Sequence, residues 1–285
     1  VAALTATGAV GDPSIEGRVV LADADLIVRD PRVAITDMSG EALLSGDRVT
    51  LEGITATANG GPVAIIGGLD YSDFSVSDGA ITITGRGLAF EAIDGLRTEI
   101  NTDLTIAMAG GEPTIGGRVT IVRGDYRDPI RLTEQLLSTY ETRVTAGGMA
   151  ETSALDAIRL DLTIASAEDI IVDNNYGRVE VGSNLRVTGT VGAPVLGGRL
   201  AMREGGEVYL GGQSYTLRRG SVDFTNATRI EPDFDVALET RVRNYDITLE
   251  LSGTPETLEV TLRSPGISQQ DALSLLLTGQ LADDT

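Results

Sequence analysis

Apolar and polar residues alternate along most of this 285-residue chain. The alternation is strict over 158–164 and recurs over 179–191, 245–251 and 258–262. Successive side chains of a β-strand point to opposite faces, so this period gives each strand one apolar and one polar face. Such segments follow one another at about the 8–12-residue spacing that is typical of all-β folds. We therefore expect an all-β protein built on a long, bent, mostly antiparallel sheet.

The composition supports strands joined by tight turns. Glycine accounts for 35 of the 285 residues, or about 12%, whereas roughly 7% is usual, and there are only 9 prolines. Hydrophobic residues make up 41% of the chain, which is enough to form a core. The acidic chain is therefore not expected to be disordered.

Four residue types are absent from the sequence: histidine, cysteine, tryptophan and lysine. These absences exclude a Ser-His-Asp triad, a thiol nucleophile, a Schiff-base lysine and an ordinary zinc site. The 22 arginines face 42 acidic residues, and the net charge of -20 disfavours binding to nucleic acid. We expect no enzymatic activity, no cofactor, no metal site and no nucleic-acid partner.

A short motif occurs three times, with the pattern G-x-P-x-h-x-G-R-h, in which h is an apolar residue. It covers 11–19, 111–119 and 192–200, and a partial copy covers 253–258. Glycine and proline predict a turn, and the second glycine predicts a bend or bulge within the following strand. The copies are too unevenly spaced for a compact solenoid, so they are interpreted as bends in one continuous sheet.

One or two short amphipathic helices interrupt the strand pattern. Asp128 and Pro129 are typical of a helix start, and Leu132 and Leu136 follow at helical spacing, so we expect a helix over about 130–143. A loop then extends to about residue 155.

The second helix is expected near the C-terminus, from a capping-box-like start at Ser268 to a stop at Gly279. The domain organisation predicted from these patterns is an elongated β-groove over 1–263, with a loop and short helix at about 128–155. A capped, leucine-rich helix and tail then cover 264–285.

Two acidic pairs, Asp23/Asp25 and Asp169/Asp173, could in principle support glycoside hydrolysis or hold calcium. Aspartate is common at turns for backbone reasons, and Asp23 and Asp25 are expected to flank a turn after a strand. A turn or solvated role is therefore favoured for both pairs.

Arg18, Arg118 and Arg199 occupy equivalent positions in the three motif copies. They could form an anion-binding row. Outward charges that block aggregation between strands are the favoured interpretation.

The apolar faces of so many strands must be covered, either by closing the sheet into a filled sandwich or by an apolar ligand in a trough. Aromatic residues are only 4% of the chain, so the lining would be aliphatic. The candidate groove-lining residues are Val19, Leu21, Val119, Ile121, Leu160, Leu162, Ile164, Val179, Val181, Leu185, Val187, Leu200, Met202, Val236, Leu238, Ile247, Leu249, Leu251, Val260 and Leu262.

Three parts of the sequence resemble the TamB family, within the AsmA-like group of bacterial envelope proteins. They are the three motif copies, the stretch over 209–224 with its Gly-Gly and Arg-Arg-Gly-Ser-Val-Asp-Phe, and the closing stretch over 263–279. The closing stretch, a strand ending in Ser-Pro before a capped leucine-rich helix, is the most specific of the three.

This resemblance implies a sheet bent into a U, the β-taco fold, with an aliphatic groove that carries phospholipid between the inner and outer membranes. It further implies a parent protein anchored in the inner membrane through an N-terminal segment, with this chain a soluble fragment in the periplasm of a diderm bacterium. The C-terminal region would contact a TamA-like outer-membrane barrel, and the candidate contact residues are Leu273, Leu276 and Leu277.

Two alternatives remain open from the sequence. A structural or adhesive β-solenoid, such as an autotransporter-passenger-like stalk, would have a filled core. A glycosidase on a β-helix would use an acidic cluster in a cleft. The scarcity of aromatic residues for sugar stacking argues against the glycosidase.

Overall fold

The computed structural model describes residues 2–9, 12–29, 32–72, 75–129 and 157–281. Sixteen strands and one α-helix lie in these ranges. The helix expected over 130–143 and the loop after it fall outside the described residues.

The strands are long and follow one another through short turns. Their bounds are β1 Ala2–Ala9, β2 Asp12–Arg29, β3 Arg32–Ser45, β4 Arg48–Ala58, β5 Gly61–Ser72, β6 Ser75–Ile93, β7 Leu96–Ala109, β8 Glu112–Tyr126, β9 Arg159–Asn174, β10 Gly177–Thr190, β11 Ala193–Met202, β12 Glu207–Leu210, β13 Gln213–Phe224, β14 Pro232–Val242, β15 Tyr245–Gly253 and β16 Glu259–Arg263.

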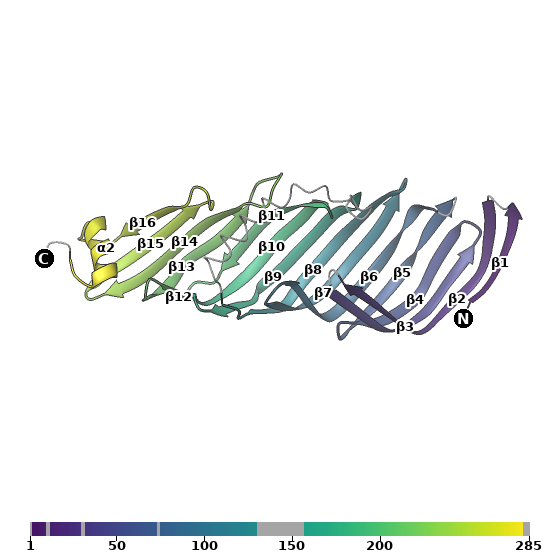
Figure 1. The fold of residues 1–285 in the computed structure, drawn as a ribbon, viewed down its shortest axis with the longest axis horizontal. Helices are drawn as coiled ribbons and strands as arrows, with labels where there is room; N and C mark the ends of the chain where they lie inside the picture. The colour runs from purple at the N-terminus through teal and green to yellow at the C-terminus, as the bar shows by residue number, and fades with distance from the viewer. Residues whose placement is uncertain (1, 10–11, 30–31, 73–74, 130–156, 282–285) are drawn as a thin grey trace. The chain divides into compact units, whose positions relative to one another are not determined.

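The hydrogen-bonded order of the strands follows the sequence from β1 to β11 and then from β13 to β16, while β12 pairs with β10 and β13 (Figure 1). The strand pairs with described registers are antiparallel, including β1 with β2, β6 with β7 and β14 with β15. The expectation of an all-β protein with a long sheet is confirmed.

The chain divides into two compact units. Unit 1 comprises Val1–Gly124, Ala154–Ser166 and Asn184–Leu196, and unit 2 comprises Asp125–Ser153, Ala167–Ser183 and Gly197–Thr285.

In unit 1, the register places aliphatic side chains opposite one another on one face of the sheet. Ile65 on β5 lies opposite Ile83 on β6, which in turn lies opposite Leu104 on β7. Cross-strand pairs of branched side chains stabilise a sheet by packing on its pleated surface. The buried residues Ile54 and Val63 lie in the neighbouring strands β4 and β5 of this unit.

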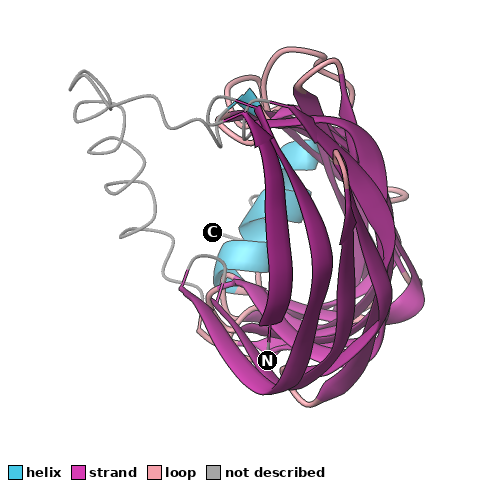
Figure 2. Ribbon diagram, turned by 90° about the vertical axis from the view of Figure 1, so that its right-hand side faces the viewer, coloured by secondary structure: helices cyan, strands magenta, loops and turns pink. Residues whose placement is uncertain are grey.

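The repeated motif marks positions where only glycine fits. Its second glycine has a φ of 150° at Gly17, 125° at Gly117 and 109° at Gly198, a region that residues with a Cβ rarely adopt. A Cβ added to Gly117 would lie 2.2 Å from the carbonyl oxygen of Asp103 on the adjacent strand. Each of these glycines lies inside a strand, and the strands bend along their length (Figure 2). The register runs through Gly17 and Gly198 without a shift, so the motif does not mark a bulge at these two positions, and the bend stays a prediction.

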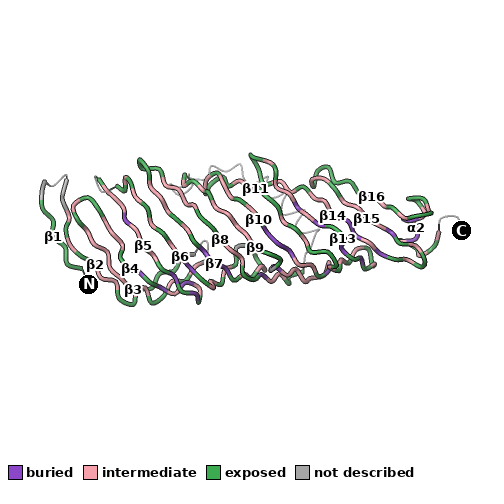
Figure 3. Tube along the Cα trace, turned by 180° about the vertical axis from the view of Figure 1, so that it is seen from behind, coloured by how far each residue is buried: buried purple, intermediate pink, exposed green. Residues whose placement is uncertain are grey.

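In unit 2, one face of the sheet is apolar and the other is charged. Leu217, Leu238, Leu249 and Leu262 lie opposite one another across β13, β14, β15 and β16. Buried stretches recur along these strands (Figure 3).

The charged face of unit 2 carries cross-strand ion pairs. Arg199 binds Asp223, and Arg219 donates from Nε and a terminal nitrogen to the carboxylate of Asp235. The strict alternation of the sequence thus separates the two kinds of surface.

The helix α2, Gln269–Thr278, covers the C-terminal end of the apolar face of unit 2. The hydroxyl of Ser268 accepts a hydrogen bond from the Asp271 N–H at 3.1 Å, and Gly279 adopts a left-handed conformation with φ 72°. Both predicted caps are therefore confirmed. Ala272 and Leu275 are fully buried against Ile247.

Within the described ranges, no helix combines the length and the hydropathy needed to cross a bilayer.

Candidate functional site

Unit 2 contains an apolar pocket of about 360 Å³. Strands β9 to β15, the turns between them and the segment that joins β15 to β16 supply its walls. Its lining residues are Val172, Asn174, Tyr176, Gly177, Val179, Met202, Val208, Leu210, Leu217, Phe234, Val236, Leu238, Leu251 and Leu258. Most of these side chains are aliphatic, so the pocket suits a hydrocarbon ligand.

The floor of the pocket belongs to a buried cluster of Tyr215, Leu217 and Leu238. Partly buried neighbours such as Val236 and Leu251 pack against this cluster and also line the pocket. The pocket is therefore a hollow over a packed floor, and its lining is held by the same side chains that stabilise the unit.

Polar groups occur at one end of the pocket, where β9 turns into β10. The Asn174 side-chain oxygen accepts a hydrogen bond from the Tyr176 N–H at 2.9 Å. The amide nitrogen of Asn174 is buried and has no hydrogen-bond partner among the described residues. Beneath the apolar lining, burial raises the pKa of the Tyr215 phenol.

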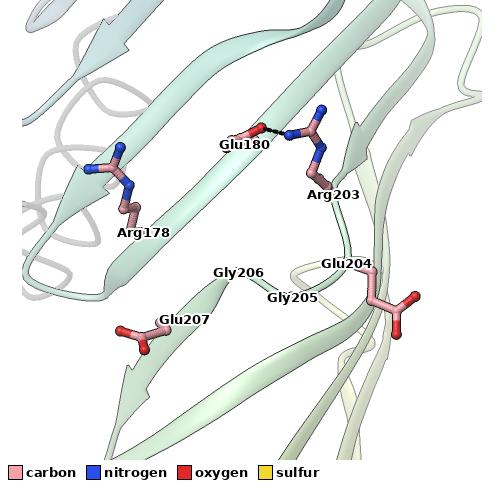
Figure 4. A pocket seen from close by; sticks show the side chains of 7 residues that line it. All are labelled: Arg178, Glu180, Arg203, Glu204, Gly205, Gly206 and Glu207. Atoms are coloured by element: carbon pink, nitrogen blue, oxygen red, sulfur yellow. Dashed lines mark ion pairs between the residues drawn. The ribbon is translucent and has the colours of Figure 1, made fainter.

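A second, charged hollow of about 220 Å³ lies where the Gly205-Gly206 segment joins β11 to β12 (Figure 4). Its lining includes Arg178, Arg203 and Glu180, and Arg203 pairs with Glu180 as well as with Glu168. The hydrogen bond from Arg203 to Glu168 raises the pKa of the guanidinium, which therefore stays charged.

The residues that line the charged hollow and those that line the apolar pocket alternate along the same strands. Arg178 and Glu180 line the charged hollow, whereas Val179 lines the apolar pocket. Adjacent residues of a strand point to opposite faces, so the two hollows lie on opposite faces of the sheet. On the charged face, arginines and carboxylates form ion pairs. The apolar face carries the aliphatic pocket of about 360 Å³.

Five of the predicted groove residues line the apolar pocket. They are Val179, Met202, Val236, Leu238 and Leu251. Val181 is also buried in unit 2, and Leu200 on β11 lies opposite Val222.

Four further predicted groove residues lie toward the C-terminal end of the same face. Leu249 packs against the cluster under the pocket, whereas Ile247 and Leu262 belong to the cluster covered by α2. Val260 on β16 is 54% exposed.

The other predicted groove residues belong to unit 1, where they are partly buried and do not line this pocket. They are Val19, Leu21, Val119, Ile121, Leu160, Leu162, Ile164, Leu185 and Val187.

Nine lining residues were not anticipated from the sequence: Val172, Asn174, Tyr176, Gly177, Val208, Leu210, Leu217, Phe234 and Leu258. The alternation of the sequence does not place Leu217 on the apolar face, because the register of β13 with β14 shifts between Leu217 and Arg219. After this shift, the apolar residues of β13 occupy the other set of alternate positions. The adjacent pair Arg218-Arg219 is the signal that could have located this irregularity. Both arginines bind carboxylates on the charged face, which an unbroken strand does not allow for adjacent residues.

Of the predicted partner-contact residues, Leu273 and Leu277 are exposed on α2, at 47% and 75%. Leu276 packs against both buried clusters of unit 2.

The polar residues singled out from the sequence lie within the strands of the sheet. Arg18 binds Glu41, and Arg118 and Arg199 are exposed on their strands. The expectation that Asp23 and Asp25 flank a turn was wrong, because both lie inside β2 where its register with β3 shifts. Aspartate tolerates the left-handed conformation that Asp23 adopts there, with φ 51°.

The second acidic pair is partly described. Asp173 forms an ion pair with Arg178 at 2.7 Å, so we assign it a structural role. In the part of the chain that the structure describes, no group of three or more acidic side chains is arranged to hold a metal ion.

The fold and the site define a class: an antiparallel β-sheet protein with one charged face and one apolar face that holds a hydrocarbon-lined pocket. The sequence of residues 52–285 matches the family described as the TamB C-terminal domain. The chain therefore belongs to the TamB family. A search of curated proteins finds no match to it.

Family membership gives the functional setting. TamB proteins are envelope proteins of the translocation and assembly module, and they act with an outer-membrane partner in outer-membrane protein assembly. The family is a structural and transport family.

Proposed function

We propose that this chain is a periplasmic lipid-transport module. Phospholipid acyl chains move along the apolar face of the sheet between the inner and the outer membrane, and this movement supports outer-membrane biogenesis. The observation that carries the proposal is the apolar pocket of about 360 Å³ in unit 2. In this proposal, residues 1–263 form a U-shaped groove, and residues 264–285 form a capped, leucine-rich helix and a tail.

The pocket has the size and chemistry for a single acyl chain. Its volume lies at the lower end of the roughly 300–1,000 Å³ range of ligand pockets, which favours one hydrocarbon chain over a bulky ring system. Each buried methylene contributes about 0.8 kcal/mol. Binding of a chain therefore needs few polar contacts, and the chain can slide without breaking strong bonds.

The opposite face explains how such a module stays in water. The ion pairs Arg199–Asp223 and Arg219–Asp235 lie on the face away from the pocket, and their arginine side chains are solvent-exposed. A sheet with this asymmetry can shield a hydrocarbon chain on one side while the other side remains hydrated.

The partners in this proposal are the inner membrane, through an anchor in the parent protein, and a TamA-like outer-membrane barrel. The exposed Leu273 and Leu277 of α2 are the proposed contacts with the barrel. Exposed leucines on a short helix are typical of helix-in-groove contacts.

Site-specific photo-crosslinking tests the proposal. A photoreactive residue at Val208, which lines the pocket, should crosslink to phospholipid in cells, whereas one at the adjacent Glu207 should not. The two positions share a strand and differ in the face they occupy, so Glu207 is a matched control. Mass spectrometry of protein purified without detergent should also detect bound phospholipid.

Equal crosslinking at Val208 and Glu207, or no crosslinking at either position, would contradict the proposal. Absence of lipid together with a solvent-inaccessible, filled pocket would instead support a structural stalk.

A further inference from the structure

We infer that Asn174 makes the apolar pocket selective for chains that carry an ester carbonyl, as acyl glycerolipids do. The inference rests on the proposed function, because it names the chemical feature that distinguishes one class of lipid within the same pocket. Asn174 acts here as a specificity-determining residue.

The orientation of the Asn174 amide follows from its contacts. Asn174 is the last residue of β9, and its side-chain oxygen accepts a hydrogen bond from the Tyr176 N–H at 2.9 Å. A backbone N–H can only donate, so the acceptor end of the amide must face it. The Nδ2 donor is thereby directed elsewhere, and it has no hydrogen-bond partner in the described part of the chain.

A buried donor without a partner is costly, and native proteins satisfy nearly all such groups. Asn174 is also a lining residue of the pocket, where only Tyr176 offers another side-chain group that donates well. A ligand oxygen is therefore the natural partner for Nδ2. A hydrocarbon chain alone would leave this donor unsatisfied.

The charge of the site selects a neutral oxygen. The fourteen lining residues include no charged side chain. Transfer of a carboxylate or phosphate into such an environment is strongly unfavourable without a counter-charge. An ester carbonyl is neutral, accepts a hydrogen bond, and lies at the head of an acyl chain.

The Nδ2 donor is covered by its neighbours, with less than 1 Å² of accessible surface on the atom. The carbonyl reaches it when an entering chain moves apart the lining side chains that cover it. Rearrangement of side chains at a binding site is common on ligand binding.

The test compares a diacyl phospholipid with its dialkyl ether analogue, which has the same headgroup and chain length but no carbonyl. Both are used with short, water-soluble chains, and binding to the whole chain is measured by displacement of an apolar fluorescent dye. The native protein should bind the ester about tenfold more tightly, which corresponds to about 1.4 kcal/mol. This comparison needs no substitution.

Two variants assign the preference to one residue. Asn174→Leu keeps the branching at Cγ without the donor, and it should reduce the ester preference to within about twofold. Asn175→Leu makes the same substitution at the adjacent, exposed residue, which does not line the pocket, and it should keep the preference, so it is the matched control.

Equal affinity of the native protein for ester and ether lipids would overturn the inference and leave the proposed function in place. Failure of both lipids to bind would overturn the proposed function as well. A free fatty acid of the same chain length that binds more tightly than the ester would show that the acceptor is a carboxylate, and it would also overturn the assignment.

Discussion

Leu217 on β13 and Leu238 on β14 lie directly opposite each other in the antiparallel register, and both are almost completely buried, at 0% and 1% exposure. Both also line the apolar pocket. The same side chains thus hold unit 2 together and form the surface proposed to carry lipid. Stability and binding are linked at this pair.

Truncation of Leu238 should therefore destabilise unit 2 and enlarge the pocket. Leu238→Ala removes a fully buried side chain from a packed floor, and such substitutions cost about 2–5 kcal/mol, with the loss increasing with the cavity left behind. The midpoint of urea unfolding measures this loss. Val260→Ala is the control, because Val260 on the same face is 54% exposed and should change stability by less than about 1 kcal/mol.

An unchanged urea midpoint for Leu238→Ala would contradict the packed floor described here.

The motif glycines give a second prediction. Gly117→Ala should destabilise the protein by more than about 1 kcal/mol, because φ is 125° and the new Cβ would meet the carbonyl oxygen of Asp103 at 2.2 Å. The adjacent Gly116 is the control. A Cβ added there meets only the carbonyl oxygen of Asp161, at 3.4 Å, so Gly116→Ala should be tolerated.

Thermal unfolding of the two glycine variants, compared with the native protein, measures this difference. Similar melting temperatures for both variants would show that the bend at Gly117 does not require glycine.

Because Tyr215 is buried, the protein should lose stability at alkaline pH. Burial raises its pKa in the folded protein above the value of about 10 in the unfolded chain. Its contribution to stability is therefore fully present below pH of about 10 and is lost as the pH rises through the folded-state pKa. Absorbance of the tyrosinate band should show a late-titrating phenol, and alkaline unfolding should accompany it.

The variant Tyr215→Phe should lose this late step and depend less on alkaline pH. Tyr209 should also titrate late, because its hydroxyl donates to Glu207 at 2.8 Å and this bond raises its pKa, so the variant should lose one late-titrating phenol and keep another. A titration curve that is identical in the variant would contradict the assignment of the late step to Tyr215.

Alternation predicted the fold class, because a period of two is imposed by strand geometry and needs no knowledge of tertiary contacts. The caps Ser268 and Gly279 were equally predictable, since a helix start and stop depend on local backbone groups. The location of the pocket was not predictable in this way. The alternation of apolar and polar positions along β13 shifts by one residue just after Leu217, where the strand has a bulge. Tyr176 lies in a turn, where periodicity gives no information.

The role of each apolar residue also depends on what covers it. Leu251 and Ile247 alternate identically in β15, yet Leu251 lines the pocket and Ile247 is fully buried beneath α2. Sequence periodicity predicts on which face of the strand each side chain lies. Only the placement of the helix decides whether that face is available to a ligand.

The helix α2 provides the last prediction, from two leucines on one helix. Leu275 is fully buried against Ile247, whereas Leu277 is 75% exposed. Leu275→Ala should release α2 from the sheet at a cost of about 2–5 kcal/mol and expose the apolar surface beneath it. Leu277→Ala should leave stability within about 0.5 kcal/mol of the native value, because an exposed side chain loses little packing. Hydrogen exchange of the α2 amides should be faster in the Leu275 variant alone, and equal protection in both variants would show that Leu275 does not hold the helix in place.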